Sequence, residues 1–214
     1  METDYILNKL RYTFKFIVIG DSGIGKTSLV RKYQNIHYKH TDPDPTIGVE
    51  FTSVTFNSGN YIIKNQIWDT AGQEAYRSLT KSFFHGKVGF IVAFDITRRD
   101  SFNQLPMWLR YVNDYVSKNI SENIVIVGCK SDLNKYRRVQ YNEALKFAQK
   151  HKHKYIETSS KNFINVNKPF LYLSDIILKK VLAGKIIPDE YNGVMLYDSN
   201  IYEKKINKSC CIIL

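Results

Sequence analysis

Apolar residues, many of them β-branched or aromatic, recur in short runs that are separated by segments long enough for helices. Runs of this kind are typical of strands in a buried sheet. They predict strands at residues 14–19, 49–56, 61–68, 88–95, 124–129 and 155–158. The segments between and after them predict helices at residues 26–35, 74–84, 101–118, 140–150 and 166–183. Ser101 and Gln104 have capping-box spacing at the start of the third helix.

This alternation predicts an α/β fold, in which a six-stranded, mostly parallel sheet carries helices on both faces. Residues 57–60, Asn-Ser-Gly-Asn, predict the turn of one antiparallel hairpin. In such sheets the ligand binds beyond the carboxyl ends of the strands. We divide the chain into an N-terminal extension (1–11), one globular domain (12–183) and a flexible tail (184–214), where Pro188 and Gly193 interrupt the apolar pattern.

Composition narrows the classes of function. The chain has 214 residues, 43% of them hydrophobic, which is enough for one substantial core. Its net charge of +11 would suit nucleic acid or an acidic membrane, but no zinc-finger spacing or RNA-binding aromatic pattern accompanies it. We therefore attribute the positive charge to a codon bias and expect no nucleic-acid partner. No secretion signal begins the chain, and the longest apolar stretch, 88–94, is too short to cross a bilayer, which predicts residence in the cytosol.

The strongest chemical signal is a phosphate-binding loop at residues 20–27, Gly-Asp-Ser-Gly-Ile-Gly-Lys-Thr, between a predicted strand and a predicted helix. Glycines let backbone N–H groups approach an anion, and the following helix contributes its positive end. Lys26 would lie along the β and γ phosphates, and the Thr27 hydroxyl would hold Mg²⁺. The predicted phosphate-binding residues of this loop are Ser22, Gly23, Ile24, Gly25, Lys26, Thr27 and Ser28. Because ATPases and kinases use similar loops, this one does not identify the base.

Three further stretches stand at the ends of predicted strands. They are residues 68–74 (Trp-Asp-Thr-Ala-Gly-Gln-Glu), 129–132 (Cys-Lys-Ser-Asp) and 158–161 (Thr-Ser-Ser-Lys). Asp132 can accept hydrogen bonds from N1–H and the exocyclic amine of guanine, a pair of donors that adenine lacks. Alone, Lys130 and Asp132 would be an ordinary surface pair. In register with the other motifs they favour a guanine site.

Together these stretches resemble the Ras superfamily, and within it the Rab family of membrane-traffic GTPases, over about residues 12–183. The resemblance implies a P-loop NTPase G domain that binds GTP or GDP with Mg²⁺, hydrolyses GTP slowly and recruits effectors in the GTP state. Residues 46–51, 67–74 and 95–99 are similar to the sub-branch that acts around the Golgi and recycling endosomes. This implies residence on the cytoplasmic face of such a membrane, with a soluble cytosolic pool.

The resemblance also implies roles for single residues. Gln73 would orient the attacking water, and the N–H of Gly72 would meet the γ phosphate. Mg²⁺ would be held by Thr27, Thr46 and Asp69. The residues expected around the base are Tyr38, Cys129, Lys130, Asp132, Ser159, Ser160 and Lys161. Those expected to face effectors are Ile47, Phe51, Trp68 and Phe83, although such aromatic residues are equally often part of a core.

Two departures from the family pattern affect these expectations. Cys129 stands where the family has asparagine, and a thiol is a weak donor and a weak acceptor. The loss of one or two hydrogen bonds would weaken nucleotide binding by about 1–3 kcal/mol. Thr46 also lies one position farther from Thr27 than in the family, which lengthens the first switch loop. The alternative is an atypical membrane-anchored scaffold with weak or absent nucleotide retention.

The cysteines suggest a lipid anchor rather than a disulfide. Cys210 and Cys211 are adjacent near the end, and the last four residues, Cys-Ile-Ile-Leu, have the CaaX form that favours geranylgeranyl. In the Rab family a double cysteine is usually doubly geranylgeranylated, and two such chains give stable anchoring. An unstructured tail with accidental thiols is the alternative.

The resemblance finally implies a set of partners for a monomer. They are an exchange factor, a GTPase-activating protein, Rab effectors, a prenylation escort and a GDP-dissociation inhibitor. No built-in catalytic arginine is evident, with Arg77 and Arg98 left open, so we expect the activating protein to supply one.

Overall fold

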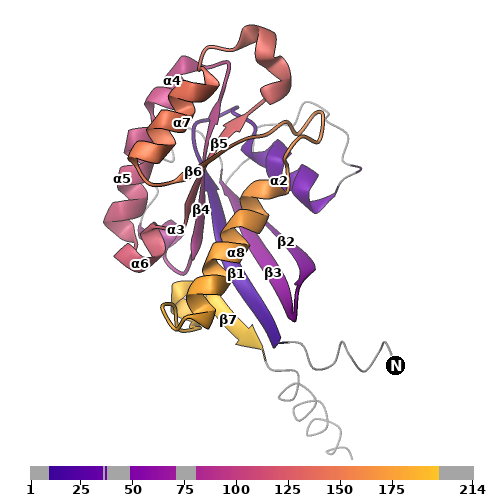
Figure 1. The fold of residues 1–214 in the computed structure, drawn as a ribbon, viewed down its shortest axis with the longest axis vertical. Helices are drawn as coiled ribbons and strands as arrows, with labels where there is room; N and C mark the ends of the chain where they lie inside the picture. The colour runs from indigo at the N-terminus through magenta and orange to yellow at the C-terminus, as the bar shows by residue number, and fades with distance from the viewer. Residues whose placement is uncertain (1–9, 36, 38–48, 71–80, 198–214) are drawn as a thin grey trace, which may run out of the picture.

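The computed structural model describes residues 10–35, 37, 49–70 and 81–197, which contain a seven-stranded sheet flanked by helices (Figure 1). The strands are β1 (Leu10–Ile19), β2 (Val49–Ser58), β3 (Tyr61–Thr70), β4 (Gly89–Asp95), β5 (Ile124–Cys129), β6 (Lys154–Glu157) and β7 (Val194–Tyr197). The α-helices are α2 (Lys26–Gln34), α3 (Lys81–Phe84), α4 (Arg99–Asn103), α5 (Leu105–Tyr115), α6 (Lys118–Ser121), α7 (Tyr141–Lys150) and α8 (Lys168–Leu182). Two short 3₁₀ helices, η2 (Ser131–Tyr136) and η3 (Glu190–Asn192), complete the elements of these residues.

The strand order is β2-β3-β1-β4-β5-β6, with β7 paired to β1. Parallel pairs join β1 to β3 and β4, β4 to β5, and β5 to β6. β2 and β3 are antiparallel and are connected through Gly59 and Asn60. The predicted mostly parallel sheet and its single tight hairpin are therefore confirmed.

Two apolar clusters cover the opposite faces of the sheet. Successive side chains of a strand point to opposite faces, so Phe16 of β1 packs with residues of α2 and α8, whereas Ile17 packs with residues of α4, α5 and α7. In Figure 1, α8 crosses one face while α4, α5 and α7 line the other side. Every residue of β4 and β5 is buried, because both of their faces are covered.

The predicted helix over residues 101–118 is divided. α4 ends at Asn103 and α5 starts at Leu105, with Pro106 in its first turn. The predicted capping box is wrong, because Ser101 lies inside α4, where its hydroxyl accepts a 3.1 Å hydrogen bond from the N–H of Asp95. Ser101 therefore fastens α4 to the end of β4. Of the predicted helix at 74–84, only the part from residue 81 lies within the described residues.

The chain beyond residue 183 differs from the flexible tail that the sequence predicted there. It continues through η3 into β7, which pairs antiparallel with β1 from Arg11 opposite Tyr197 to Phe14 opposite Val194. Val194 is fully buried in the same cluster as α8. Residues up to Tyr197 therefore pack on the domain, and β7 is a strand that the apolar pattern did not predict.

Gly193 allows β7 to pack on the domain, and a substitution of Gly193 tests this role. Its φ is 81°, and a Cβ there would lie 2.7 Å from the carbonyl oxygen of Gly86 and 2.8 Å from the backbone nitrogen of Val88. We predict that Gly193→Ala lowers the free energy of unfolding by about 2–4 kcal/mol, from backbone strain and overlap with main chain. Gly184→Ala is the matched control, because Gly184 has φ 68° with nothing within 4 Å of a Cβ. It should cost about 1 kcal/mol; equal losses in urea denaturation would contradict this account of β7.

Candidate functional site

The predicted phosphate loop lies at the carboxyl end of β1, between Ile19 and the start of α2 at Lys26. At Gly20 a Cβ would lie 2.3 Å from the carbonyl oxygen of Ala93, so only glycine lets the loop pass the end of β4. Ile24 is fully buried in the core beside α2, which anchors the loop from its middle. Ser22 to Ser28 therefore form one continuous cradle at the expected edge of the sheet.

Lys26 carries a desolvated positive charge into this loop. The residue is 5% exposed, and its Nζ donates hydrogen bonds of 2.8 Å to the carbonyl oxygens of Gly20 and Asp21. Burial lowers the pKa of Lys26 to about 8, although nearby Asp69 acts in the opposite direction. Neutral carbonyls only partly replace water around an ammonium group. A phosphate would supply the missing negative charge, so the cradle fits the predicted ligand.

Asp69 is the complementary buried charge. β3 places it beside Val18 of β1, and the neighbouring Thr70 hydroxyl donates to the carbonyl oxygen of Val18 at 2.8 Å. Asp69 is 1% exposed, and no hydrogen bond of ordinary geometry reaches either carboxylate oxygen from the described residues, although the side chain of Thr27 lies close enough to influence the carboxylate. Burial raises the pKa of Asp69 to about 6, against the lowering influence of Thr27 and Lys26. Oxygen ligands from a carboxylate and a threonine hydroxyl fit Mg²⁺.

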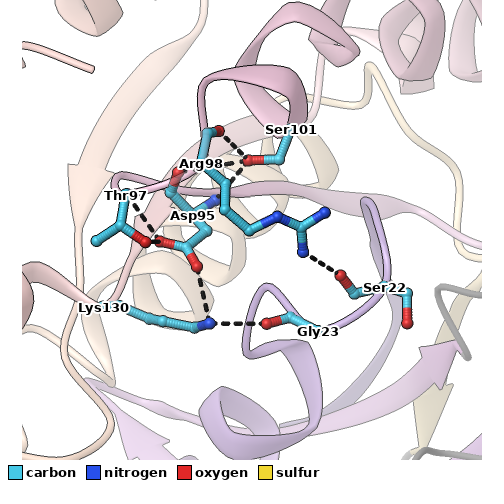
Figure 2. Close-up of polar contacts among 7 residues, drawn as sticks. All are labelled: Ser22, Gly23, Asp95, Thr97, Arg98, Ser101 and Lys130. Atoms are coloured by element: carbon cyan, nitrogen blue, oxygen red, sulfur yellow. Dashed lines mark hydrogen bonds and ion pairs between the residues drawn. The ribbon is translucent and has the colours of Figure 1, made fainter. Parts of the chain in front are cut away.

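The third motif begins where β5 ends and reaches back to the phosphate loop. Lys130 has φ 64°, and its Nζ donates 2.8 Å to the carbonyl oxygen of Gly23 and lies 2.7 Å from Oδ2 of Asp95, as Figure 2 shows. Cys129 is 4% exposed, and burial raises the pKa of its thiol to about 12, with the side chain of Thr158 opposing the shift. Lys130 therefore ties the base motif to the phosphate loop, while Cys129 stays a neutral thiol at neutral pH.

The fourth motif orients Asp132. The Ser159 hydroxyl, which is fully buried, donates to Oδ1 of Asp132 at 2.6 Å and accepts from the N–H of Asn162 at 3.0 Å. Ser160 is half-buried and Lys161 is exposed on the same turn. Two motifs separated by α7 and β6 thus meet in space, and the described members of the set predicted for the base lie at the end of β5 and on the two segments that follow β5 and β6.

Two further residues hold the phosphate loop and were not predicted. Arg98 donates from Nη1 to the carbonyl oxygen of Ser22 at 2.6 Å, across 76 positions of sequence (Figure 2). Trp108 of α5 donates from Nε1 to Oδ1 of Asp21 at 3.1 Å, across 87 positions. Asp95 acts on the loop indirectly, because it binds Lys130, and it is 1% exposed. No local spacing in the sequence signals contacts of this range.

The predicted effector-facing residues that are described gather at one surface. Phe51 is 56% exposed, and its ring centroid lies 5.1 Å from that of half-buried Trp68. Together with half-buried Phe83, exposed Val49 and buried Lys87, these two rings line a cavity of about 280 Å³. Phe51 is therefore a surface residue rather than a core residue.

Other predicted residues lie outside the described part of the chain. They are Tyr38, Thr46, Ile47, Gly72, Gln73, Arg77, Cys210 and Cys211. Their roles stay predictions. Across the described residues, no helix has the length and apolar character needed to traverse a membrane.

Comparison with known proteins agrees with this geometry. The sequence model of the Ras family matches residues 15–179. The chain therefore belongs to the Ras family and is a small GTPase, which binds guanine nucleotide and hydrolyses GTP.

Individual relatives narrow the class further. The human Ras-related protein Rab-4B is 37% identical over 199 residues, which is 92% of this chain and 92% of the relative. The rat and mouse Rab-4B proteins are each 39% identical over 186 residues, which is 87% of this chain and 86% of theirs. The chain is thus a Rab-type small GTPase, as its motifs predicted.

The contact between Arg98 and the phosphate loop can be tested by substitution. Arg98 fixes the carbonyl oxygen of Ser22 and adds positive charge beside Lys26. We predict that Arg98→Ala speeds GDP release about fivefold, because one exposed, charge-assisted hydrogen bond is worth about 1 kcal/mol. Arg99→Ala is the matched control, since Arg99 binds Glu143 and the carbonyl oxygen of Arg138 instead. Equal release rates for wild type and Arg98→Ala would contradict the assigned role.

Proposed function

We propose that this GTPase is a switch on the cytoplasmic face of an endosomal or Golgi membrane, which recruits effectors while GTP is bound. One observation supports the proposal: the predicted phosphate loop and the predicted base motif lie together beyond the ends of β1 and β5 and are joined by Lys130, whose Nζ donates to the carbonyl oxygen of Gly23. The scaffold alternative is not favoured, because the buried charges of Lys26 and Asp69 have a clear use only in binding nucleotide and metal.

Mg²⁺ would be held by Thr27 and Asp69, with Thr46 as the predicted third ligand. When bound, it neutralises charge on the β and γ phosphates. Lys26 and the N–H groups of the loop stabilise the same charge as the phosphate bond breaks. Gln73 orients the attacking water, and no residue of this chain needs to act as a strong base.

The switch itself is proposed to lie in two segments, around residues 36–48 and 70–85, the second of which runs from the end of β3 through α3. Thr46 and the N–H of Gly72 would be drawn toward the γ phosphate and released after hydrolysis. The resulting change alters the surroundings of Phe51, Trp68 and Phe83, where effectors would bind. An exchange factor, an activating protein and a GDP-dissociation inhibitor would control the cycle from outside.

Membrane attachment is proposed through geranylgeranyl groups on Cys210 and Cys211, added with the help of an escort protein. Two lipid chains give lasting attachment where one is marginal. Lys204, Lys205 and Lys208 would add attraction to acidic lipids of the cytoplasmic leaflet.

The nucleotide held by the purified protein tests this function. We expect about one guanine nucleotide per chain, and single-turnover hydrolysis of GTP on the order of 10⁻⁴ to 10⁻³ per second, as for an unassisted small GTPase. Gln73→Leu should bind GTP equally well and hydrolyse it at least about tenfold more slowly, because the water is no longer oriented. Protein that retains no nucleotide, or adenine nucleotide, would overturn the proposal.

Cys129 should set the rate at which nucleotide leaves. Its buried thiol stands at the end of β5, next to the side chain of Thr158, where an amide could both donate and accept. We predict that Cys129→Asn slows GDP dissociation about 10- to 100-fold, which corresponds to about 1–3 kcal/mol.

Cys129→Ala is the control for this substitution. It removes the thiol without adding hydrogen bonds, so its GDP release should stay within about threefold of wild type. If Cys129→Asn releases GDP as fast as the wild type, the thiol does not weaken binding and the hypothesis is wrong.

A further inference from the structure

The cavity beside Phe51 contains a lysine that the aromatic residues do not explain. Its apolar walls come from β2, the end of β3 and α3, through Val49, Phe51, Trp68 and Phe83. Lys87, from the turn between α3 and β4, completes the lining. At about 280 Å³ the cavity falls at the small end of ligand pockets, so it suits one side chain or a fragment rather than a cofactor.

Lys87 is largely buried at this position. The residue is 9% exposed, its Nζ lies 4.2 Å from the centroid of the Trp68 ring, and it donates a long hydrogen bond of 3.3 Å to the carbonyl oxygen of His85. The attraction between a cation and an indole ring is weaker than the cost of burying an unpaired ammonium group. The site therefore holds a positive charge that is only partly compensated.

No carboxylate of the described residues compensates it. The charged group that influences Lys87 is Lys15 of β1, and this second cation adds to burial in lowering the pKa of Lys87 to about 8. Lys15 itself has a partner, Glu190, at 3.8 Å. Lys87 therefore lines an apolar cavity with a positive charge that no carboxylate of the described residues neutralises.

We propose that Lys87 makes this cavity selective for a protein segment that presents an apolar side chain next to a carboxylate. The apolar group fills the space between Phe51 and Phe83, and the carboxylate accepts a charge-assisted hydrogen bond from Nζ of Lys87. The proposal rests on the effector surface of the proposed function and specifies the chemistry of its partner. Charge complementarity supports that partner, since Lys87 and neighbouring Lys15 make this end of the cavity positive and would attract a carboxylate.

A pair of small probes tests the proposal without a known effector. Hydrocinnamate carries a phenyl ring and a carboxylate, and its amide has the same shape without charge. Isotope-labelled protein is titrated with each probe at about pH 7, with GDP or a non-hydrolysable GTP analogue bound, and the indole N–H signal of Trp68 is followed. We expect hydrocinnamate to bind about fivefold more tightly than its amide, as one charge-assisted hydrogen bond at a half-open site allows.

Matched variants show whether Lys87 causes the preference. The preference for hydrocinnamate over its amide should vanish in Lys87→Met and persist in Lys87→Arg. It should also persist in Lys64→Met, which removes the same charge from an exposed position of β3. Retained guanine nucleotide shows that each variant is folded and that the GTPase function stands by itself. Equal binding of both probes, a preference that survives Lys87→Met, or no shift of the Trp68 signal would each overturn the proposal. Binding of the amide alone would mark the cavity as a purely apolar site.

Discussion

Two buried charges of opposite sign determine how this molecule works. The ammonium of Lys26 donates to two backbone carbonyls, and both carboxylate oxygens of Asp69 are buried without a hydrogen bond of ordinary geometry from the described residues. Burial disfavours the charged form of both side chains: it lowers the pKa of Lys26 to about 8 and raises the pKa of Asp69 to about 6. A nucleotide phosphate and the proposed Mg²⁺ would bring the charge that each side chain lacks. Ligand binding therefore relieves an electrostatic cost of the fold, and it should stabilise the folded state by mass action.

The frame around these charges explains why distant loops act as one site. Asp95, at the end of β4, is almost fully buried and binds Lys130 at 2.7 Å, while Thr97 donates to the same carboxylate through its N–H and its hydroxyl. Lys130 then holds the phosphate loop at Gly23, and Arg98 holds it one residue earlier, at Ser22. Figure 2 shows these contacts converging on the loop. Cys129, which stands where the family has asparagine, directly precedes Lys130. A substitution in the base motif is therefore adjacent to the phosphate loop.

Local signals in the sequence were sufficient for most of the fold and for the centre of the site. The apolar runs located β1 to β6, and the glycines and lysine of residues 20–27 encode the cradle within eight consecutive positions. Features that depend on distant contacts were missed. β7 has only four residues, and it is held by close packing of Gly193 against Gly86. The contact of Arg98 with Ser22 spans 76 positions, and Lys87 reads as an ordinary surface lysine until the fold places it over Trp68.

The role of Lys26 as a charge held for nucleotide can be measured directly with Lys26→Met. Urea denaturation without nucleotide and GDP titration report on the two sides of the claim. If burial of the ammonium is a cost that only phosphate relieves, the nucleotide-free variant is at least as stable as the wild type, while its GDP affinity falls by about 100-fold or more. A variant that unfolds more readily without nucleotide yet binds GDP as tightly as the wild type would show that Lys26 is structural, contrary to this account.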